Sequence, residues 1–298
     1  MKKIFSIPVV SIMLILLCMV SLAYAAQPIE NLVKGQMLDQ AKEKEQIEDF
    51  ISKKASPKEF LLKHKDSLGR EELKSITKLE ELSYSSPYKA VILDEQAARA
   101  LLSGGNFSEA LLNAPYEWVV PIIAKGNNTA GNTVASFSLY KANEQWQVGE
   151  VGGYLRPSDI AFSADVNAIA RFLKDNNITI GRAFSHVVAL GLHMDLLYVA
   201  AEQGEFFIPL IHSRDELYGL EHLKIYTRNQ FVAAVGDIFR NGGKRDSGLA
   251  LTYGAPPLGP TAKQTSSARP VILTIAIVGL VALASIYLFR RIQLADKS

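Results

Sequence analysis

Serine–lysine pairs at S-x-x-K spacing are the residues best placed for nucleophilic chemistry in this sequence. Ser75 and Ser138 are each followed three positions later by a lysine, Lys78 and Lys141. In one class of acyl-transfer enzymes this S-x-x-K spacing places a lysine beside a serine nucleophile, and a K-[ST]-G element completes the site. The sequence has no K-[ST]-G element, and Ser75 falls on a charged helix and Ser138 on an expected strand. We therefore expect neither serine to act as a nucleophile.

Other catalytic and nucleotide-binding motifs are missing or incomplete. No G-x-S-x-G turn occurs, and the only cysteine, Cys18, lies in an apolar run near the N-terminus. The segment Gly242-Gly243-Lys244 matches only the end of a phosphate-binding loop, because Arg245 stands where that loop has serine or threonine. We therefore assign no catalytic residue and no cofactor-binding residue.

Histidines gather in the C-terminal half of the sequence, with acidic residues near them in the chain. The set is His186, His193, His212, His222, Asp195, Asp215 and Glu216. A zinc site needs ligands that converge, often at spacings such as H-E-x-x-H, and no such spacing occurs. We expect these histidines to be partly buried or on the surface, and we assign no metal ligand. The alternative is that they form a metal site or a pH-sensing cluster.

An internal duplication is predicted from two similar stretches. Residues 117–123 resemble 205–211 position by position, and the spacing within 140–146 resembles that within 226–231. We therefore predict two copies of a unit in which a helix packs on an antiparallel sheet.

Aromatic residues and prolines stand at matching positions of these stretches. The aromatic residues are Trp118, Trp146, Phe206 and Phe231. We expect them to be core residues, since aromatic side chains dominate core burial. Pro121 and Pro209 cannot donate a hydrogen bond within a sheet, so each is expected at a sheet edge or at a bulge.

The elements that would position these residues begin with a charged helical region, residues 27–84. Ser56, Pro57 and Glu59 form a capping box that predicts the start of one helix, and a further helix is expected from about Arg70 to Leu82. The mixed lysine and glutamate pattern is typical of a solvated helix face, and a partner-binding helical hairpin is the alternative.

The region from residue 85 to 250 alternates strand and helix signals and predicts an α+β fold. Strands are expected at 88–93, 117–123, 133–140, 145–151, 185–190, 196–201, 206–211, 223–226 and 231–235. Helices are expected after Asp94, Ser108 and Ser163. Hairpins in series indicate an antiparallel sheet with helices on one face, organised as two units at 85–157 and 158–250.

The N-terminus has the pattern of an export signal, residues 1–26. Lys2 and Lys3 precede an apolar run, which ends in the A-x-A sequence of residues 23–25. We expect cleavage after Ala25 or Ala26. An uncleaved anchor is the alternative, because the apolar run approaches the ~20 residues that span a bilayer.

The C-terminus predicts a tether and one transmembrane helix. Residues 251–270 are rich in proline, glycine, serine and threonine, and 271–289 carry no charge. Arg290 and Arg291 open the tail 290–298 and mark its side as cytoplasmic. The chain is therefore expected to pass the cell membrane once, with its folded part outside and its tail inside.

Composition limits the classes of partner. The formal net charge is +2, without a basic stripe, so we expect no nucleic acid as partner. Removal of the signal would leave no cysteine, which is more typical of a bacterial envelope than of an animal cell surface. The expected partners are the lipid bilayer, through the C-terminal helix, and a protein.

Three functions fit these features. The first is a membrane-anchored extracytoplasmic binding or interaction module without an evident catalytic site. The second is a cell-envelope hydrolase whose site is assembled from scattered residues, for which a pocket with strongly perturbed carboxylates would be evidence. The third is a structural or assembly subunit of an envelope complex that uses the helical region 27–84. We expect a protein that is not an enzyme.

Overall fold

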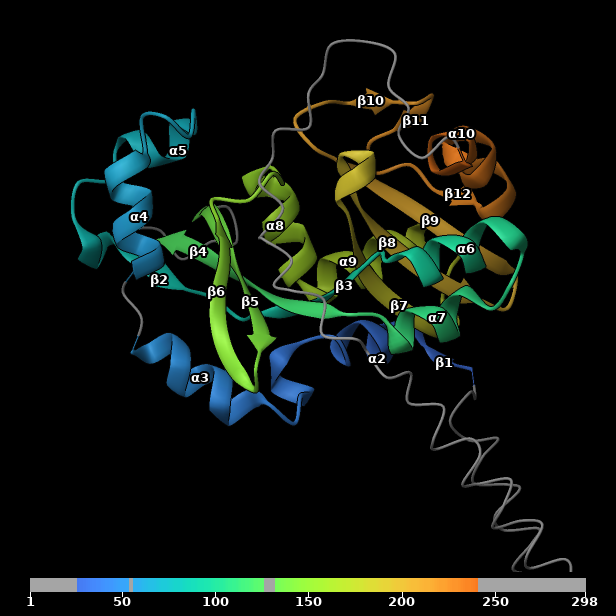
Figure 1. Ribbon diagram of the computed structural model, residues 1–298, viewed down its shortest axis with the longest axis horizontal. Helices are drawn as coiled ribbons and strands as arrows, with labels where there is room; N and C mark the ends of the chain where they lie inside the picture. Colours follow the sequence, from blue (N-terminus) through green and yellow to red (C-terminus); the bar gives the residue numbers. More distant parts are fainter. Residues whose placement is uncertain (1–25, 54–55, 126–131, 241–298) are drawn as a thin grey trace, which may run out of the picture. The chain divides into compact units, whose positions relative to one another are not determined.

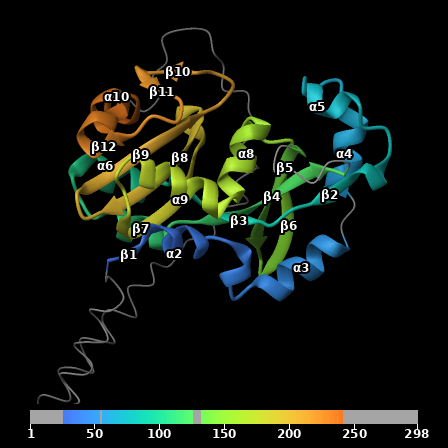
Figure 2. The same ribbon diagram turned by 180° about the vertical axis from the view of Figure 1, so that it is seen from behind.

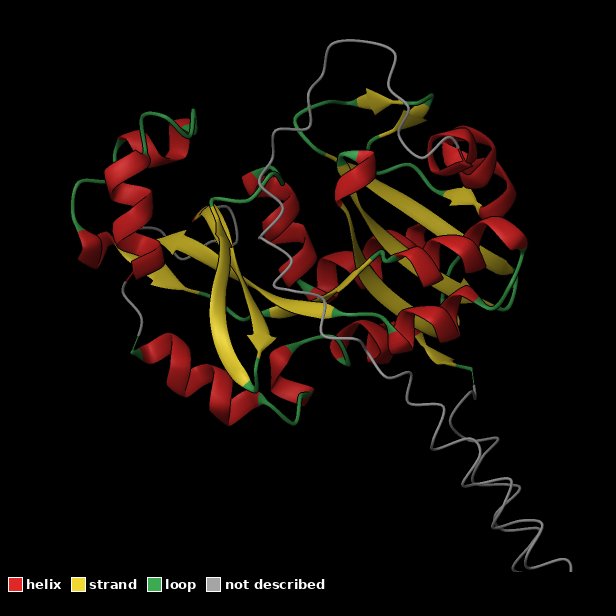
Figure 3. Cartoon of the chain, viewed as in Figure 1, coloured by secondary structure: helices red, strands yellow, loops and turns green. Residues whose placement is uncertain are grey.

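The computed structural model describes residues 26–53, 56–125 and 132–240, which all belong to one compact unit (Figure 1). These residues form a mixed α+β fold, as predicted, but the strands of both expected units join one large sheet (Figure 3). The expected signal sequence, tether, transmembrane helix and tail lie outside the described residues, as does the segment at Gly242. Within the described ranges, no helix has the length and apolar character needed to cross a membrane.

The large sheet has the strand order β12-β9-β8-β7-β3-β4-β5-β6, with β1 beside β7 and β2 beside β4. Its strands are β1 (Gln27–Pro28), β2 (Leu82–Tyr84), β3 (Tyr88–Ile92), β4 (Tyr116–Ala124), β5 (Thr133–Ala142), β6 (Gln145–Val151), β7 (Ile180–Ala189), β8 (Met194–Ala201), β9 (Gly204–Ile211) and β12 (Tyr226–Thr227). All neighbouring strands described are antiparallel except the central pair, β3 and β7. A small separate hairpin joins β10 (Glu216–Leu217) and β11 (Leu220–Glu221).

Helices cover both faces of the sheet, which differs from the expectation of one covered face (Figures 1 and 2). One face carries α2 (Ile29–Lys34), α8 (Pro157–Ala164) and α9 (Val166–Asp175). The other face carries α6 (Glu95–Ser103), α7 (Phe107–Asn113) and α10 (Arg228–Arg240) over β7 to β9. Helices α3 (Lys44–Ser52), α4 (Ser56–His64) and α5 (Glu71–Lys74) join a third core with β4 and β5.

The central strands explain this arrangement. Along β8, Leu196 and Tyr198 enter the core under α6, α7 and α10, whereas Leu197 and Val199 enter the core under α8 and α9. All four side chains are fully buried. Successive strand residues point to opposite faces, so a continuous apolar run needs cover on both sides.

The expected strand at 231–235 is wrong, because this segment lies in helix α10. Thr227 and Gln230 form a reciprocal capping box: the Thr227 backbone N–H donates to Gln230 Oε1 at 2.9 Å, and the Gln230 N–H donates to Thr227 Oγ1 at 3.5 Å. Phe231 and Val235, spaced four apart, are both fully buried on one helix face. The expected strand at 223–226 reduces to the short β12.

The helical region is more broken than expected. A single helix was predicted after Arg70, but α5 ends at Lys74 and a separate 3₁₀ turn follows at Leu79–Glu81. Leu73 and Leu82 are buried on either side of this break. Short helical segments, held by the buried side chains of Leu73 and Leu82, therefore replace a continuous amphipathic helix.

The two matching prolines occupy different surroundings. Pro209 lies on the outer side of β9 beyond β12, and its carbonyl accepts a hydrogen bond from the Leu223 N–H at 2.8 Å. Pro121 lies inside the sheet, where its carbonyl accepts from the Ser85 N–H at 2.9 Å in the gap between β2 and β3. Pro209 is therefore at an edge, as expected, whereas Pro121 avoids a lost hydrogen bond because its neighbour strand is interrupted there.

Candidate functional site: a carboxylate cleft on the sheet

A narrow cleft of about 40 Å³ opens between strands β4 to β6 and strands β7 and β8, on the sheet face that carries α8. We call it the carboxylate cleft. Its walls come from β4, β5, β6, β7, β8 and the segments that follow β6, β7 and β9. The lining residues are Glu117, Val119, Ser136, Phe137, Ser138, Glu150, Gly153, Tyr154, Leu155, Val188, Leu190, Asp195 and His212.

Three carboxylates from three different strands enter this cleft. Glu117 comes from β4, Glu150 from β6 and Asp195 from β8. Burial raises the pKa of Glu117 to about 7, and the charges of Asp195 and Glu150 add to this rise, whereas a hydrogen bond with Ser138 opposes it. Glu117 is therefore close to half protonated at neutral pH.

Glu150 lines the cleft and is exposed to solvent. Desolvation raises its pKa to about 7, and the charge of Asp195 adds to the rise, while His212 and Arg70 oppose it. The charge of Glu150 also raises the pKa of Glu117, so negative charges accumulate in the cleft when its carboxylates ionise.

Serine hydroxyls line the wall between these carboxylates. Ser138 Oγ accepts a hydrogen bond from the Glu150 backbone N–H at 3.1 Å. Ser136 is only 5 % exposed. Both point to the same side of β5, because strand residues two apart share a face.

Glycines leave these hydroxyls uncovered. A Cβ atom at Gly149 would lie 2.5 Å from Ser138 Oγ, and one at Gly153 would lie 2.9 Å from Ser136 Oγ. Gly153 also has a φ of +61°, which favours glycine. The glycines at these two positions therefore make space for the polar wall.

Tyr154 and His212 line the side of the cleft that holds Asp195. His212 Nε2 lies 3.2 Å from Asp195 Oδ1, and the Tyr154 ring stacks on the His212 ring at 5.7 Å with an interplanar angle of 22°. The pair holds Asp195 in place within the cleft.

Arg70, from the segment before α5, fixes the loop that carries Gly153 and Tyr154. Its guanidinium donates to the carbonyl oxygens of Gly152, Gly153 at 2.7 Å and Leu155 at 3.1 Å. It also reaches Val134 O at 3.2 Å. Its N–H groups are thus used on backbone carbonyls, and its main role is to shape the cleft wall.

The histidines considered in the sequence do not form one cluster. His212 lies in the cleft with Asp195, whereas His222 Nε2 contacts Asp159 Oδ1 at 3.2 Å and its Nδ1 accepts from the Ile211 N–H at 3.0 Å. No three or more His, Cys, Asp or Glu side chains in the described part of the chain are placed to hold a metal ion.

The other two histidines lie apart from the cleft. His186 is buried between Tyr88 and Phe184, and burial lowers its pKa to about 3. His193 ends a 3₁₀ turn with a φ of 56°. The acidic residues near them diverge as well, since Asp215 pairs with Arg156 and Glu216 is exposed in β10.

Neither Ser75 nor Ser138 has the lysine three positions later as a partner. Ser75 and Lys78 are exposed beyond α5. Ser138 is buried in the carboxylate cleft, but Lys141 forms an ion pair with Glu144 at 3.0 Å. Ser138 and Lys141 point to opposite faces of β5, because they are an odd number of residues apart.

The aromatic residues at matching positions serve the cores. Trp118 and Phe231 are buried, at 2 % and 0 % exposure, and Trp146 and Phe206 pack against cores from partly buried positions. The expectation of a core role is confirmed for these side chains.

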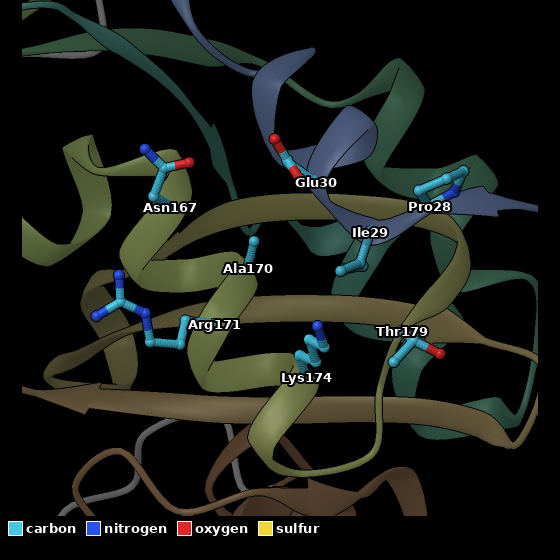
Figure 4. Close-up of a pocket in the computed structure, with 8 residues that line it drawn as sticks. All are labelled: Pro28, Ile29, Glu30, Asn167, Ala170, Arg171, Lys174 and Thr179. Atoms are coloured by element: carbon cyan, nitrogen blue, oxygen red, sulfur yellow. The ribbon is translucent and has the colours of Figure 1, made fainter.

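A larger and more open groove of about 540 Å³ lies between α2 and α9 (Figure 4). Its polar side chains include Glu30, Asn167, Arg171 and Lys174. Figure 4 shows Arg171 and Lys174 extending from α9 in different directions. Because its charged groups do not converge, this groove is a weaker candidate than the carboxylate cleft.

Comparison with protein-family models, curated proteins and solved structures found no match for this chain.

The sequence alone points to Ser138, Asp195 and His212 as candidate residues, but not to Glu117, Glu150 and Ser136 as members of a site. A signal was present in β5, where Ser136 and Ser138 alternate with apolar residues, and in β4, where Glu117 stands in an otherwise apolar run. A polar residue on a buried strand face is informative, since such groups need a partner or a function.

Proposed function

We propose that this chain is a membrane-anchored extracytoplasmic binding protein and that its carboxylate cleft binds the cationic part of a ligand. The observation that carries the proposal is the meeting of Glu117, Glu150 and Asp195 in one cleft whose lining contains no lysine or arginine. Bringing partly desolvated carboxylates of like charge together costs free energy, and a cation that enters the cleft would offset that cost.

The electrostatics of the cleft couple binding to proton release. A positive charge beside Glu117 and Glu150 stabilises their ionised forms, so it lowers both pKa values from about 7. Ligand binding should therefore release protons near neutral pH, and affinity should rise as the pH increases through 7.

The membrane setting is part of the proposal and is supported by the sequence pattern. The export signal at 1–26 and the apolar stretch 271–289 would place the cleft outside the membrane, with the Arg290–Ser298 tail in the cytoplasm. A single anchor and a tether at 251–270 suit a protein that captures a ligand or a protein partner close to the membrane surface.

We also propose that the sheet arose by duplication, with the two copies aligned by their order of elements and not by the similar stretches 117–123 and 205–211. Each half has a helix pair followed by a three-stranded meander: α6-α7-β4-β5-β6 and α8-α9-β7-β8-β9. The matching stretches 117–123 and 205–211 are the first strand of one meander and the third of the other, and Trp146 is in a strand while Phe231 is in a helix. The order of elements therefore supports duplication better than that sequence match does.

A cell-envelope hydrolase is the second candidate. The pKa of Glu117, about 7, suits a general acid or base near neutral pH. The cleft has room for only a few water-sized groups, so it fits the head group of a ligand better than a substrate with its attacking water. This volume favours binding over hydrolysis.

The test is in-cell crosslinking of the full chain, followed by identification of the captured molecules. The control is Glu202→Gln, which removes an exposed carboxylate at the β8–β9 turn. The native chain and this control should capture the same ligand. Glu117→Gln should lose it while keeping the native unfolding midpoint or a higher one. Equal capture by Glu117→Gln would overturn the assignment of the cleft, and turnover of a captured molecule would favour the hydrolase.

A further inference from the structure

The carboxylate cleft is poorly arranged for a metal ion. Divalent metal ions need several ligands converging at about 2.0–2.6 Å from one point. The described side chains of Glu117, Glu150, Asp195 and His212 do not converge in this way. A cation with its own hydrogen-bond donors places acceptors farther away, at about 2.8 Å from the nitrogen, and tolerates a wider spacing.

Ser136 provides a second and independent sign of a ligand. The side chain lines the cleft and the residue is 5 % exposed. No hydrogen-bond partner for its hydroxyl is found among residues 26–53, 56–125 and 132–240. The hydroxyl of this nearly buried residue faces the cleft, so its oxygen is available to a hydrogen-bond donor that enters.

The missing Cβ atoms show that the space before the hydroxyls is kept open. Side chains at Gly149 and Gly153 would contact Ser138 Oγ and Ser136 Oγ at 2.5 and 2.9 Å. The two serine oxygens and the Glu117 carboxylate therefore remain accessible from one side.

An apolar wall continues from the polar end of the cleft to the surface. Leu190 is 49 % exposed although it is a large apolar residue, and it lines the cleft with Val188 and Leu155. Methylene groups of an extended side chain pack well on such a wall, while the charged end reaches the polar partners. The cleft thus combines acceptors for a cationic head with a path for an alkyl stem.

We infer that the carboxylate cleft binds a primary ammonium group on an alkyl stem, such as the side chain of a lysine in a protein or peptide partner. The inference rests on the proposed function, that the cleft is the ligand site, and adds the chemical class of the ligand. Glu117 and Asp195 supply the charge, Ser136 and Ser138 accept hydrogen bonds, and Leu190 contacts the stem.

Calorimetric titration of the full chain in detergent micelles, with n-butylammonium chloride at pH 8 and constant ionic strength, tests this inference. Butylammonium should bind, whereas tetramethylammonium, which carries the same charge without N–H donors, should bind at least ~10-fold more weakly, as expected for lost charged hydrogen bonds. Calcium chloride serves as the metal probe.

Variants distinguish the contribution of the ammonium group to binding from that of the alkyl stem. Glu117→Gln and Ser136→Ala should each weaken butylammonium binding by ~5-fold or more, as expected when one polar partner is removed. Leu190→Ala should weaken butylammonium binding and leave methylammonium binding unchanged. The matched controls Glu202→Gln and Ser103→Ala, at exposed positions outside the cleft, should bind like the native chain.

The outcomes distinguish this inference from the proposed function. Binding of calcium but not of butylammonium, lost in Glu117→Gln, would overturn the ammonium class and keep the cleft as a cation site. The absence of binding by every probe, together with Glu117-dependent capture in cells, would also overturn the ammonium class alone. Butylammonium binding that Glu117→Gln and Ser136→Ala leave unchanged would overturn both.

Discussion

Arg70 donates a hydrogen bond of 2.7 Å to the carbonyl oxygen of Gly153, and so ties the N-terminal helical region to one wall of the carboxylate cleft. The residues are far apart in the sequence, and the contact is partly buried. The helical region therefore helps to shape the candidate site.

Arg70→Ala should lower the free energy of unfolding by about 2–4 kcal/mol, because several carbonyl oxygens lose a charged donor. Chemical denaturation measures the effect. The control is Arg99→Ala, whose side chain is 78 % exposed in a surface ion pair and should change stability by less than about 0.5 kcal/mol. Equal losses in the two variants would show that Arg70 does not hold the loop.

Glu117 should make the folded state less stable as the pH rises. Its pKa is raised from 4.5 to about 7 by burial, so the folded state binds more protons than the unfolded state between these values. The contribution is complete below pH 4.5 and is lost as the pH rises through 7.

Glu117→Gln removes this dependence and should be more stable than the native chain at pH 8 by about 2 kcal/mol, with little difference at pH 4. Urea unfolding at the two pH values measures it. Glu202→Gln should keep the native pH dependence. A native-like slope in Glu117→Gln would mean that Glu117 has an ordinary pKa.

Gly149→Ala should destabilise the fold by about 1–3 kcal/mol, since the new methyl group meets Ser138 Oγ at 2.5 Å and the Tyr140 ring at 3.2 Å. Gly191→Ala has open space around it and should stay within about 0.5 kcal/mol of the native value. Adding Ser138→Ala to Gly149→Ala should recover part of the loss. If the loss of stability in the double variant equalled the sum of the two single losses, the contact between the new methyl group and Ser138 Oγ would not be the cause of the destabilisation.

Thr227→Ala should destabilise the chain by about 1 kcal/mol, because α10 loses its capping box. Thermal unfolding followed by circular dichroism measures the change, and Asn229→Ala, at an exposed position in the same turn, is the control. No effect in Thr227→Ala would argue against the helix beginning there.

The sequence predicts local features of this fold better than distant ones. The α+β class, the helix capped by Asp94 and the strands of β4 to β6 follow from patterns within short windows. The apolar residues of the α10 segment favour a strand within a short window, whereas the Thr227–Gln230 capping box starts a helix there.

The candidate site could be predicted only in part, because its members come from separate strands. Glu117, Glu150 and Asp195 meet through the order of strands in the sheet, and that order depends on long-range pairing such as β3 with β7. Ser136 and Ser138 carried a local signal in their alternation with apolar residues. The raised pKa values arise from burial, which the sequence does not give residue by residue.

The most direct test of the central claim is the number of protons released when n-butylammonium binds the full chain at pH 7. Titration calorimetry in buffers of different ionisation enthalpy counts these protons. We expect net proton release by the native chain and by Glu202→Gln, and a clearly smaller release by Glu117→Gln. Binding without proton release, or the same release from Glu117→Gln, would contradict a cation site built on the carboxylate cleft.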